Sequence, residues 1–139
     1  MKEKIKVKLQ SIFLAALFLM VFGAVWYGIL FHNVQMESHG YSAEDYANNN
    51  PIWYLGGAII SLFIAWGIGL LLRLGSKKGL SGGILASTRA IIAFGIPLVS
   101  YPLVFSPYHD FKLYAVGLFQ IIIAWTVAGA IIGRMSYKE

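Results

Sequence analysis

The chain has 139 residues, of which 58% are hydrophobic and 12% are charged, and its formal net charge is +5. Its mean hydropathy of +0.70 excludes an ordinary soluble domain, and its length leaves room for one domain, residues 1–139. The absence of cysteine excludes disulfides, thiolate metal sites and cysteine nucleophiles. The basic charge does not indicate nucleic-acid binding, because the cations lie at the ends of apolar runs, as membrane topology requires.

The first predicted element is a transmembrane helix over residues 9–31. Leu9 to Phe31 contains no charged residue, and about 20 such residues are enough to cross a bilayer. A lysine-rich start followed by an apolar run is also typical of a cleaved signal peptide, but this run is long and lacks a clear small-residue cleavage site. We therefore expect the helix to stay in the protein.

A polar segment, residues 32–51, follows the first helix. Within it, Ser42 and Asp45 have the capping-box spacing that starts a helix. We expect a short surface helix at about residues 42–48, in a loop on the outer side of the membrane. Three consecutive asparagines and Pro51 end this helix before the next apolar run.

The second predicted helix spans residues 52–73 and carries small residues at every fourth position. This spacing places them on one face of the helix, where they let another backbone approach closely. The predicted helix-packing face comprises Gly57, Ser61, Ala65 and Gly69.

The third predicted helix, residues 83–105, contains Arg89, the one charge within an apolar run, and two prolines. Proline has no N–H, and its ring clashes with the preceding turn, so Pro97 and Pro102 should kink the second half of this helix. The kink would free carbonyls near Ala93 and Leu98 that neighbouring helices must satisfy.

The fourth predicted helix, residues 111–133, completes the bundle. Small residues lie on two adjacent stripes of it, with Ala124 and Ala128 on one and Gly129 and Gly133 on the other, and both stripes suit close helix contact. The predicted fold class is therefore all-α, an integral membrane four-helix bundle.

The distribution of lysine and arginine predicts the orientation of the bundle. Only Lys112 lies on the side opposite the termini, and cytoplasmic loops are enriched in lysine and arginine, so both termini should be cytoplasmic in a multi-pass membrane protein. The nine cations on the inner side are Lys2, Lys4, Lys6, Lys8, Arg73, Lys77, Lys78, Arg134 and Lys138. Aromatic rings should anchor the outer boundary; they are Trp26, Tyr27, Trp53, Tyr54, Tyr101, Phe105, Tyr108 and Tyr114.

Arg89 is the main candidate for a site inside the membrane. At about 1.5 Å per residue, Arg89, Trp66 and Trp125 fall at the same depth, where a cation–π contact is worth about 2 kcal/mol. Two alternatives stay open: the side chain extends to the inner headgroups, or it attracts a solute or a lipid headgroup. Gln120, at mid-depth, completes this candidate polar layer, and we expect it to form an interhelical hydrogen bond, with a pore-lining role as the alternative.

No catalytic, cofactor-binding or metal site is predicted, and the protein is not expected to be an enzyme. The potential ligands on the outer side lack the tight spacing of metal sites; they are His32, Glu37, His39, His109 and Asp110. Ser87 and Thr88 lie near the inner side, too far from the outer histidines to form a nucleophile and base pair. An outer-face catalytic site formed by His109 and Asp110 stays open.

Three segments of the chain are similar to segments of the domain of unknown function 1761 family, whose patterns read G-A-x-W-Y, S-x-E-D and G-A-I-x-G. The resemblance implies a small four-helix membrane protein of a mostly bacterial family that has no established activity to transfer. Many relatives have Ser-Pro after Trp-Tyr, and a His can occur at the place of Gln120, so no titratable role of the fourth helix is implied. The matching segments are Gly23-Ala24-Val25-Trp26-Tyr27, Ser42-Ala43-Glu44-Asp45 and Gly129-Ala130-Ile131-Ile132-Gly133.

Two functions of different classes follow. The first is a non-enzymatic structural or accessory membrane component that packs through its small-residue faces, with a homo-oligomer as the expected assembly. The alternative is an oligomeric channel or transporter for an anion or a small polar solute, with Arg89 as the attracting charge. The lipid bilayer is the expected partner in both cases. No cofactor or nucleic acid is expected, and the sequence names no small-molecule ligand.

Overall fold

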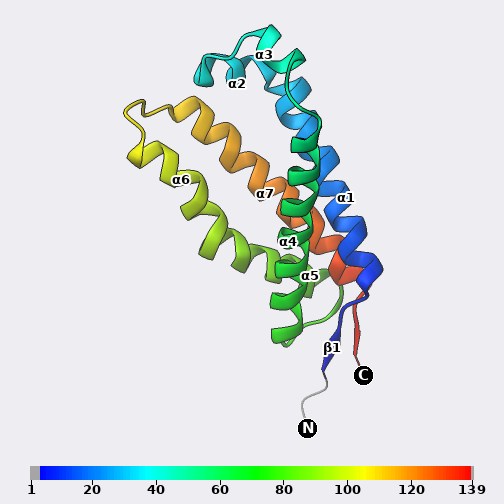
Figure 1. Cartoon of the computed structure of the whole chain (residues 1–139). Coiled ribbons are helices and arrows are strands. Elements are labelled where there is room, and N and C mark those ends of the chain that lie inside the picture. Colours follow the sequence, from blue (N-terminus) through cyan, green and yellow to red (C-terminus); the bar gives the residue numbers. More distant parts are fainter. Residues whose placement is uncertain (1–3, 139) are drawn as a thin grey trace.

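The computed structural model describes residues 4–138, apart from the side chains of Tyr46 and Lys138, so Lys2 lies outside the described residues. Four helices in the described part are long and apolar enough to cross a membrane (Figure 1). This confirms the all-α class and the prediction of four helices with the length and hydrophobicity of membrane spans. Their bounds are Leu9–Leu30, Ile52–Leu74, Gly79–Phe105 and Phe111–Arg134.

The elements define two ends of the bundle. Its terminal end holds both described chain ends and the α4–α5 connection, and its far end holds α2, α3 and the α6–α7 connection (Figure 1). At the terminal end, strand β1 (Ile5–Lys6) pairs antiparallel with β2 (Tyr137–Lys138). In chain order the helices are α1 (Leu9–Val25), the π-helix η1 (Trp26–Leu30), α2 (His32–His39), α3 (Ala43–Ala47), α4 (Ile52–Leu74), α5 (Gly79–Ala90), the π-helix η2 (Ile91–Gly95), α6 (Ile96–Phe105) and α7 (Phe111–Arg134).

The third membrane helix begins at Gly79, four residues before its predicted start. Gly79 has a φ of 73°, a left-handed conformation that glycine adopts without steric cost. Its N–H donates to Oγ of Ser136 at 3.1 Å. Residues 79–82, which precede the predicted helix, therefore form the first turn of α5, and Gly79 is anchored to the C-terminal segment.

The same helix changes to π form directly before its first proline. Pro97 has no N–H to donate to the carbonyl of Ala93, and the N–H of Ile96 bonds instead to the carbonyl of Ile91, five residues earlier. Where the sequence predicts a kink at Pro97, the helix thus has the wider π-helical turn η2 just before the proline. Beyond it, α6 diverges from α4 toward the far end of the bundle (Figure 1).

Helices α5 and α7 pack so closely that their main-chain atoms are in direct contact. A Cβ atom added at Gly83 would lie 2.8 Å from the Cα of Gly133 and would collide with the carbonyl of Gly129. A Cβ at Gly133 would in turn lie 2.7 Å from the Cα of Gly83. Such contacts require glycine on both helices, so the predicted Gly129–Gly133 stripe has a matching stripe on α5.

The buried core is concentrated in the half of the bundle nearest the termini. No side chain of α6 or α2 is buried, whereas α4 is buried only from Ser61 onward. The largest fully buried side chains include Ile68, Leu72 and Ile132. The helices are therefore closely packed at the terminal end and loosely packed at the far end.

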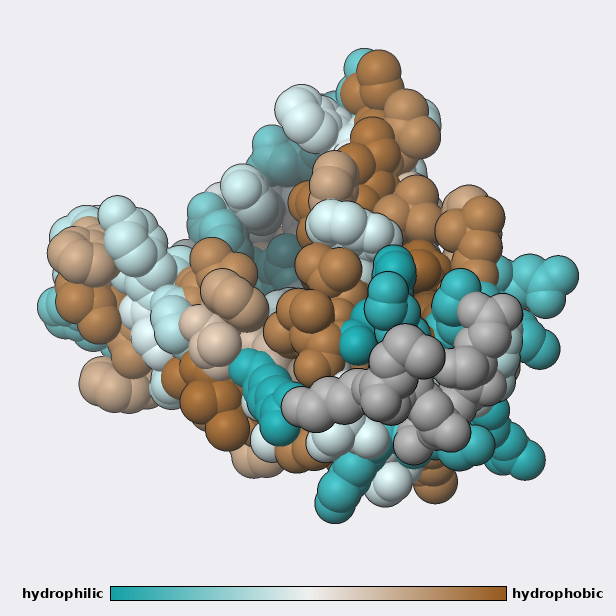
Figure 2. All heavy atoms as spheres, turned by 90° about the horizontal axis from the view of Figure 1, so that it is seen from below, coloured by the Kyte–Doolittle hydropathy of each residue, from teal (hydrophilic) through white to brown (hydrophobic). Residues whose placement is uncertain are grey.

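Cations surround the terminal end of the bundle. Figure 2 views the molecule from this end and shows hydrophilic side chains gathered there, with hydrophobic side chains around them. The exposed cations of the described residues at this end include Lys4, Lys8, Arg73, Lys77, Lys78 and Arg134.

Two short helices occupy the polar segment at the far end. The sequence does not predict α2, which ends at Gly40, a residue with a φ of 66°. α3 begins at the predicted capping box, where the N–H of Asp45 donates to Oγ of Ser42 at 3.2 Å and the N–H of Ser42 donates to the Asp45 carboxylate at 2.7 Å. The hydrogen bonds that the backbone N–H and the hydroxyl of Ser42 donate to the Asp45 carboxylate hold the pKa of Asp45 below its ordinary value.

Candidate functional site

The predicted packing face of α4 is divided between the two halves of the bundle. Ser61, Ala65 and Gly69 are buried, and a Cβ at Gly69 would meet the side chains of Val7 and Ile12 at 3.5 and 3.6 Å. Gly57 is exposed, with no atom within 4 Å of an added Cβ. Three of the four residues therefore pack within the chain itself, and one remains on the surface.

The guanidinium of Arg89 lies next to the end of α4. An added Cβ at Gly75, the residue that ends α4, would be 3.9 Å from Nη1 of Arg89. Side chains of a helix tilt toward its N-terminus, so the side chain of Arg89 extends from the last turn of α5 toward the terminal end. There it lies near the C-terminal end of α4, and the last carbonyls of a helix carry partial negative charge.

The two tryptophans of the predicted layer lie in different surroundings. Trp66 is exposed on α4, whereas Trp125 is buried on α7. The ring of Trp125 lies against Gly95 in η2, since a Cβ there would be 3.4 Å from the ring. Among the described residues, neither ring forms a cation–π contact with Arg89. A cation–π contact is formed instead at the terminal end, by Lys8 over the ring of Tyr137.

Gln120 is half-buried on α7, and within residues 4–138 the structure gives it no hydrogen bond to Tyr27 or Tyr101. The polar side chain that does link two membrane helices is Ser87, which is fully buried and donates from Oγ to the carbonyl of Trp125 at 2.6 Å. The sequence signal for this contact is the four-residue spacing of Gly79, Gly83 and Ser87.

Trp26 is a packing residue rather than the predicted boundary anchor. It is buried, and its indole N–H donates to the carbonyl of Val116 at 3.2 Å. The ring stacks against Phe22 at 5.4 Å and contacts Phe31 at 4.7 Å. Other predicted anchors, among them Trp53, do remain exposed. The wide turn η1 starts at Trp26, so this residue directs its ring toward α7.

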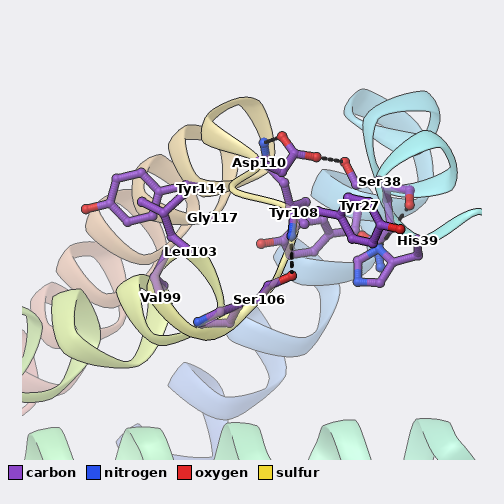
Figure 3. A pocket seen from close by; sticks show the side chains of 13 residues that line it. Tyr27, Ser38, His39, Val99, Leu103, Ser106, Tyr108, Asp110, Tyr114 and Gly117 are labelled. Atoms are coloured by element: carbon purple, nitrogen blue, oxygen red, sulfur yellow. Dashed lines mark hydrogen bonds between the residues drawn. The ribbon is translucent and has the colours of Figure 1, made fainter.

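A cavity of about 400 Å³ lies at the far end, where the helices diverge. We call it the far-end pocket. Its walls come from η1, α2, α6, the α6–α7 connection and the first turns of α7. Gly117 on α7 contributes to the space, because an added Cβ there would lie 3.5 Å from the hydroxyl of Tyr27 and 3.3 Å from Val99. Figure 3 shows Tyr27, Ser38, His39 and Asp110 around this space.

Asp110 organises the polar side of the far-end pocket. Its carboxylate caps α7 by accepting the N–H of Leu113 at 2.9 Å, and its second oxygen accepts the hydroxyl of Ser38 on α2 (Figure 3). The hydrogen bonds from Leu113 and Ser38 hold the pKa of Asp110 below its ordinary value, with a further contribution from the charge of Lys112. Asp110 therefore connects α2 to α7 as an ionised group.

In the described part of the chain, the histidines and acids of the far end lie in separate contacts. Within the described residues, no group of three or more His, Asp or Glu side chains could hold an ion. Nδ1 of His109 donates to the carbonyl of Leu103 at 2.6 Å, and Lys112 pairs with Glu37 at 3.5 Å. His109 and Asp110 are thus engaged in separate local contacts.

Comparison with protein families gives a match over most of the chain. Residues 10–133 match the family described as Protein of unknown function (DUF1761). The chain belongs to this family. Searches of curated proteins and of solved structures found no match.

The segments that resemble the DUF1761 family fall at contacts of the fold. In the first segment Trp26 bonds to α7 and Tyr27 lines the far-end pocket. In the second, Ser42 and Asp45 form the cap of α3. The third includes Gly133, which contacts α5. Each segment thus contributes a contact within the fold, and Tyr27 also faces the far-end pocket.

Proposed function

We propose that this DUF1761 protein is a non-enzymatic accessory component of the bacterial inner membrane, with four membrane crossings and both termini in the cytoplasm. The observation that carries the proposal is the difference in charge and packing between the two ends of the bundle. The terminal end gathers exposed cations (Figure 2), as expected for a cytoplasmic face, and is closed by glycine contacts between α5 and α7. In this orientation α2 and α3 lie on the outer surface.

A structural role is supported by how the polar groups of the membrane helices are used. Ser87 is fully buried and donates to a backbone carbonyl, which leaves its hydroxyl unsuited to nucleophilic attack. Ser11 is also fully buried and donates to the carbonyl of Lys8 at 2.6 Å. Both hydroxyls serve packing, as polar residues between membrane helices commonly do.

Single-cysteine labelling tests the orientation directly, because the chain has no cysteine of its own. Asn48→Cys, at the far end, should react with a membrane-impermeant maleimide in intact cells. Lys77→Cys, in the α4–α5 connection, should react only after the membrane is opened. The reverse pattern would contradict the proposed topology.

Self-association is the second part of the proposal, and Gly57 offers a specific test of it. Gly57 is the exposed member of the small-residue face, so a leucine there would obstruct a second helix without disturbing the interior of the chain. We expect Gly57→Leu to shift purified protein from dimer to monomer in light scattering with detergent correction. Gly67→Leu, on the same helix with no atom within 4 Å of an added Cβ, is the matched control. A wild-type protein that is strictly monomeric would refute this part.

An oligomeric channel or transporter for an anion or small polar solute is the second candidate function. The observation that favours it is the exposure of Arg89 on the bundle surface, where a path between copies could use its charge. Chloride flux into proteoliposomes tests this candidate, with Arg89→Ala as the variant. Flux that is absent, or that is equal in wild type and variant, would exclude the mechanism.

A further inference from the structure

The far-end pocket has the size and the mixed lining of a ligand site. Its volume of about 400 Å³ falls within the roughly 300–1,000 Å³ of small-molecule pockets. One wall is apolar, formed by Val99, Pro102 and Leu103 of α6, and the opposite side carries Asp110 and Gln35. A ligand that fits both walls must have an apolar part and a polar group.

The polar side of the pocket offers hydrogen-bond acceptors that the protein leaves unused. Oε1 of Gln35 is buried and has no hydrogen-bond partner within the described residues. The Asp110 carboxylate accepts two hydrogen bonds, although a carboxylate has about four acceptor positions. Nδ1 of His39 donates to the carbonyl of Gln35 at 3.0 Å, so Nε2 of the neutral ring is a further acceptor. Acceptors of this kind call for a ligand that donates hydrogen bonds.

The charge around the pocket favours a cation. The far-end segments, residues 32–51 and 106–112, carry four carboxylates and a single lysine. That lysine, Lys112, pairs with Glu37 at 3.5 Å, and no lysine or arginine lines the pocket. The charge of Asp110 is therefore not neutralised by an ion pair within the described residues. Tyr27 and Tyr108 add aromatic rings to the lining, and aromatic faces attract ammonium groups.

The position of the pocket suits a ligand at the membrane surface. Tyr101, Phe105 and Tyr108 surround the end of α6 and are 64%, 70% and 82% exposed. Such amphipathic rings collect at headgroup depth in membrane proteins. The apolar wall on α6 can then meet the upper part of an acyl chain, while the acceptors lie among the headgroups.

We propose that the far-end pocket binds an ammonium group, carried either by a lipid headgroup or by a small soluble amine. Asp110 supplies the opposite charge, Gln35 supplies a buried acceptor, and the tyrosine rings pack against the carbon atoms next to the nitrogen. The α6 wall contacts the apolar part of the ligand. This site is independent of the accessory role and of the oligomeric state proposed above.

The test is calorimetric titration of the purified full-length protein in a non-ionic detergent. The probes are ethanolamine and short-chain phosphatidylethanolamine, and the controls are glycerol and short-chain phosphatidylglycerol, which lack an ammonium group. We expect the ammonium compounds to bind and the controls not to bind. At least about tenfold tighter binding of the lipid than of ethanolamine would identify a headgroup, and equal binding would identify a soluble amine. No binding of any ammonium compound would overturn the proposal.

Two variants locate the site. Asp110→Asn removes the charge but keeps an oxygen that can cap α7, since Asn is as good an N-cap as Asp, and it should weaken binding by at least about tenfold. Gln35→Leu removes the buried acceptor at similar size and does not touch the cap, and it should weaken binding severalfold. Glu44→Gln, which removes a far-end carboxylate outside the pocket, should bind as wild type does. Wild-type affinity in both pocket variants would overturn the assignment.

Discussion

Gly83→Ala places a new side chain in the closest contact between the backbones of α5 and α7. The added Cβ would lie 2.8 Å from Cα of Gly133, where ordinary contact begins at 3.4 Å, so α5 and α7 must part by at least about 0.6 Å. That movement stretches the 2.6 Å hydrogen bond from Ser87 to Trp125 beyond its optimum. Overpacking costs about 1–3 kcal/mol and loss of an interhelical hydrogen bond about 0.6–1.7 kcal/mol. We expect a total destabilisation of about 2–5 kcal/mol.

Reversible unfolding in mixed micelles of increasing SDS fraction measures this difference, with tryptophan fluorescence as the signal. Gly67→Ala is the matched control, because nothing lies within 4 Å of its added Cβ and alanine favours a helix over glycine. We expect the control to unfold at or above the wild-type SDS fraction and Gly83→Ala well below it. Equal midpoints for the two variants would refute the close α5–α7 contact.

Three further predictions concern single contacts. Ser87→Ala should lower the free energy of unfolding by about 0.6–1.7 kcal/mol in the same assay, because it leaves the carbonyl of Trp125 without its donor. Trp26→Phe should lower it by about 0.5–1.5 kcal/mol through loss of the bond to Val116, and an unchanged midpoint would contradict the buried position of the indole. The folded-state pKa of Asp110 is lowered, so its contribution to stability is present above the unfolded pKa of about 3.9 and is lost as pH falls through the folded value. Acidification from pH 5 to pH 3 should therefore lower the unfolding midpoint of wild type more than that of Asp110→Asn.

The membrane helices could be predicted from the sequence because their signal is local. Each apolar run is long enough to cross a bilayer, and no comparison between distant residues is needed to see it. The cap of α3 could be predicted for the same reason, since Ser42 and Asp45 are three residues apart and satisfy each other's backbone groups. The stripe of Gly129 and Gly133 likewise follows from helical spacing alone.

The start of α5 could not be predicted with the same rules. Glycine has low helix propensity, so Gly79 and Gly82 favour a loop before the predicted helix start at residue 83. In the structure the lack of a side chain is what these positions need: a Cβ at Gly82 would lie 2.6 Å from the carbonyl carbon of Lys77, and one at Gly83 would collide with α7. Close packing against another helix outweighs intrinsic propensity here, and the partner helix is not visible in the local sequence.

The direction of the Arg89 side chain could not be predicted for a related reason. Depth places Arg89, Trp66 and Trp125 at one level, but it does not say which way each side chain points around its helix. Trp66 faces outward, Trp125 faces η2, and the guanidinium of Arg89 lies beside Gly75. The length of arginine lets it move its charge toward the terminal end, where the last carbonyls of α4 offer partial negative charge. This contact does not require a tryptophan.

Glycines of α7 serve opposite purposes in the two halves of the bundle. At Gly129, a Cβ would lie 3.0 Å from Cβ of Ser87, so the missing side chain allows two helices to touch. At Gly117, the nearest atoms would be 3.3 Å away in Val99 and 3.5 Å away in Tyr27, so the missing side chain leaves room beside a cavity. The difference arises from α6, which diverges after the π turn before Pro97 and takes no side chain into the core. The π-helical turn before Pro97 thus separates two halves of the bundle: the terminal half, whose helix contacts stabilise the fold, and the far half, whose pocket can receive a ligand.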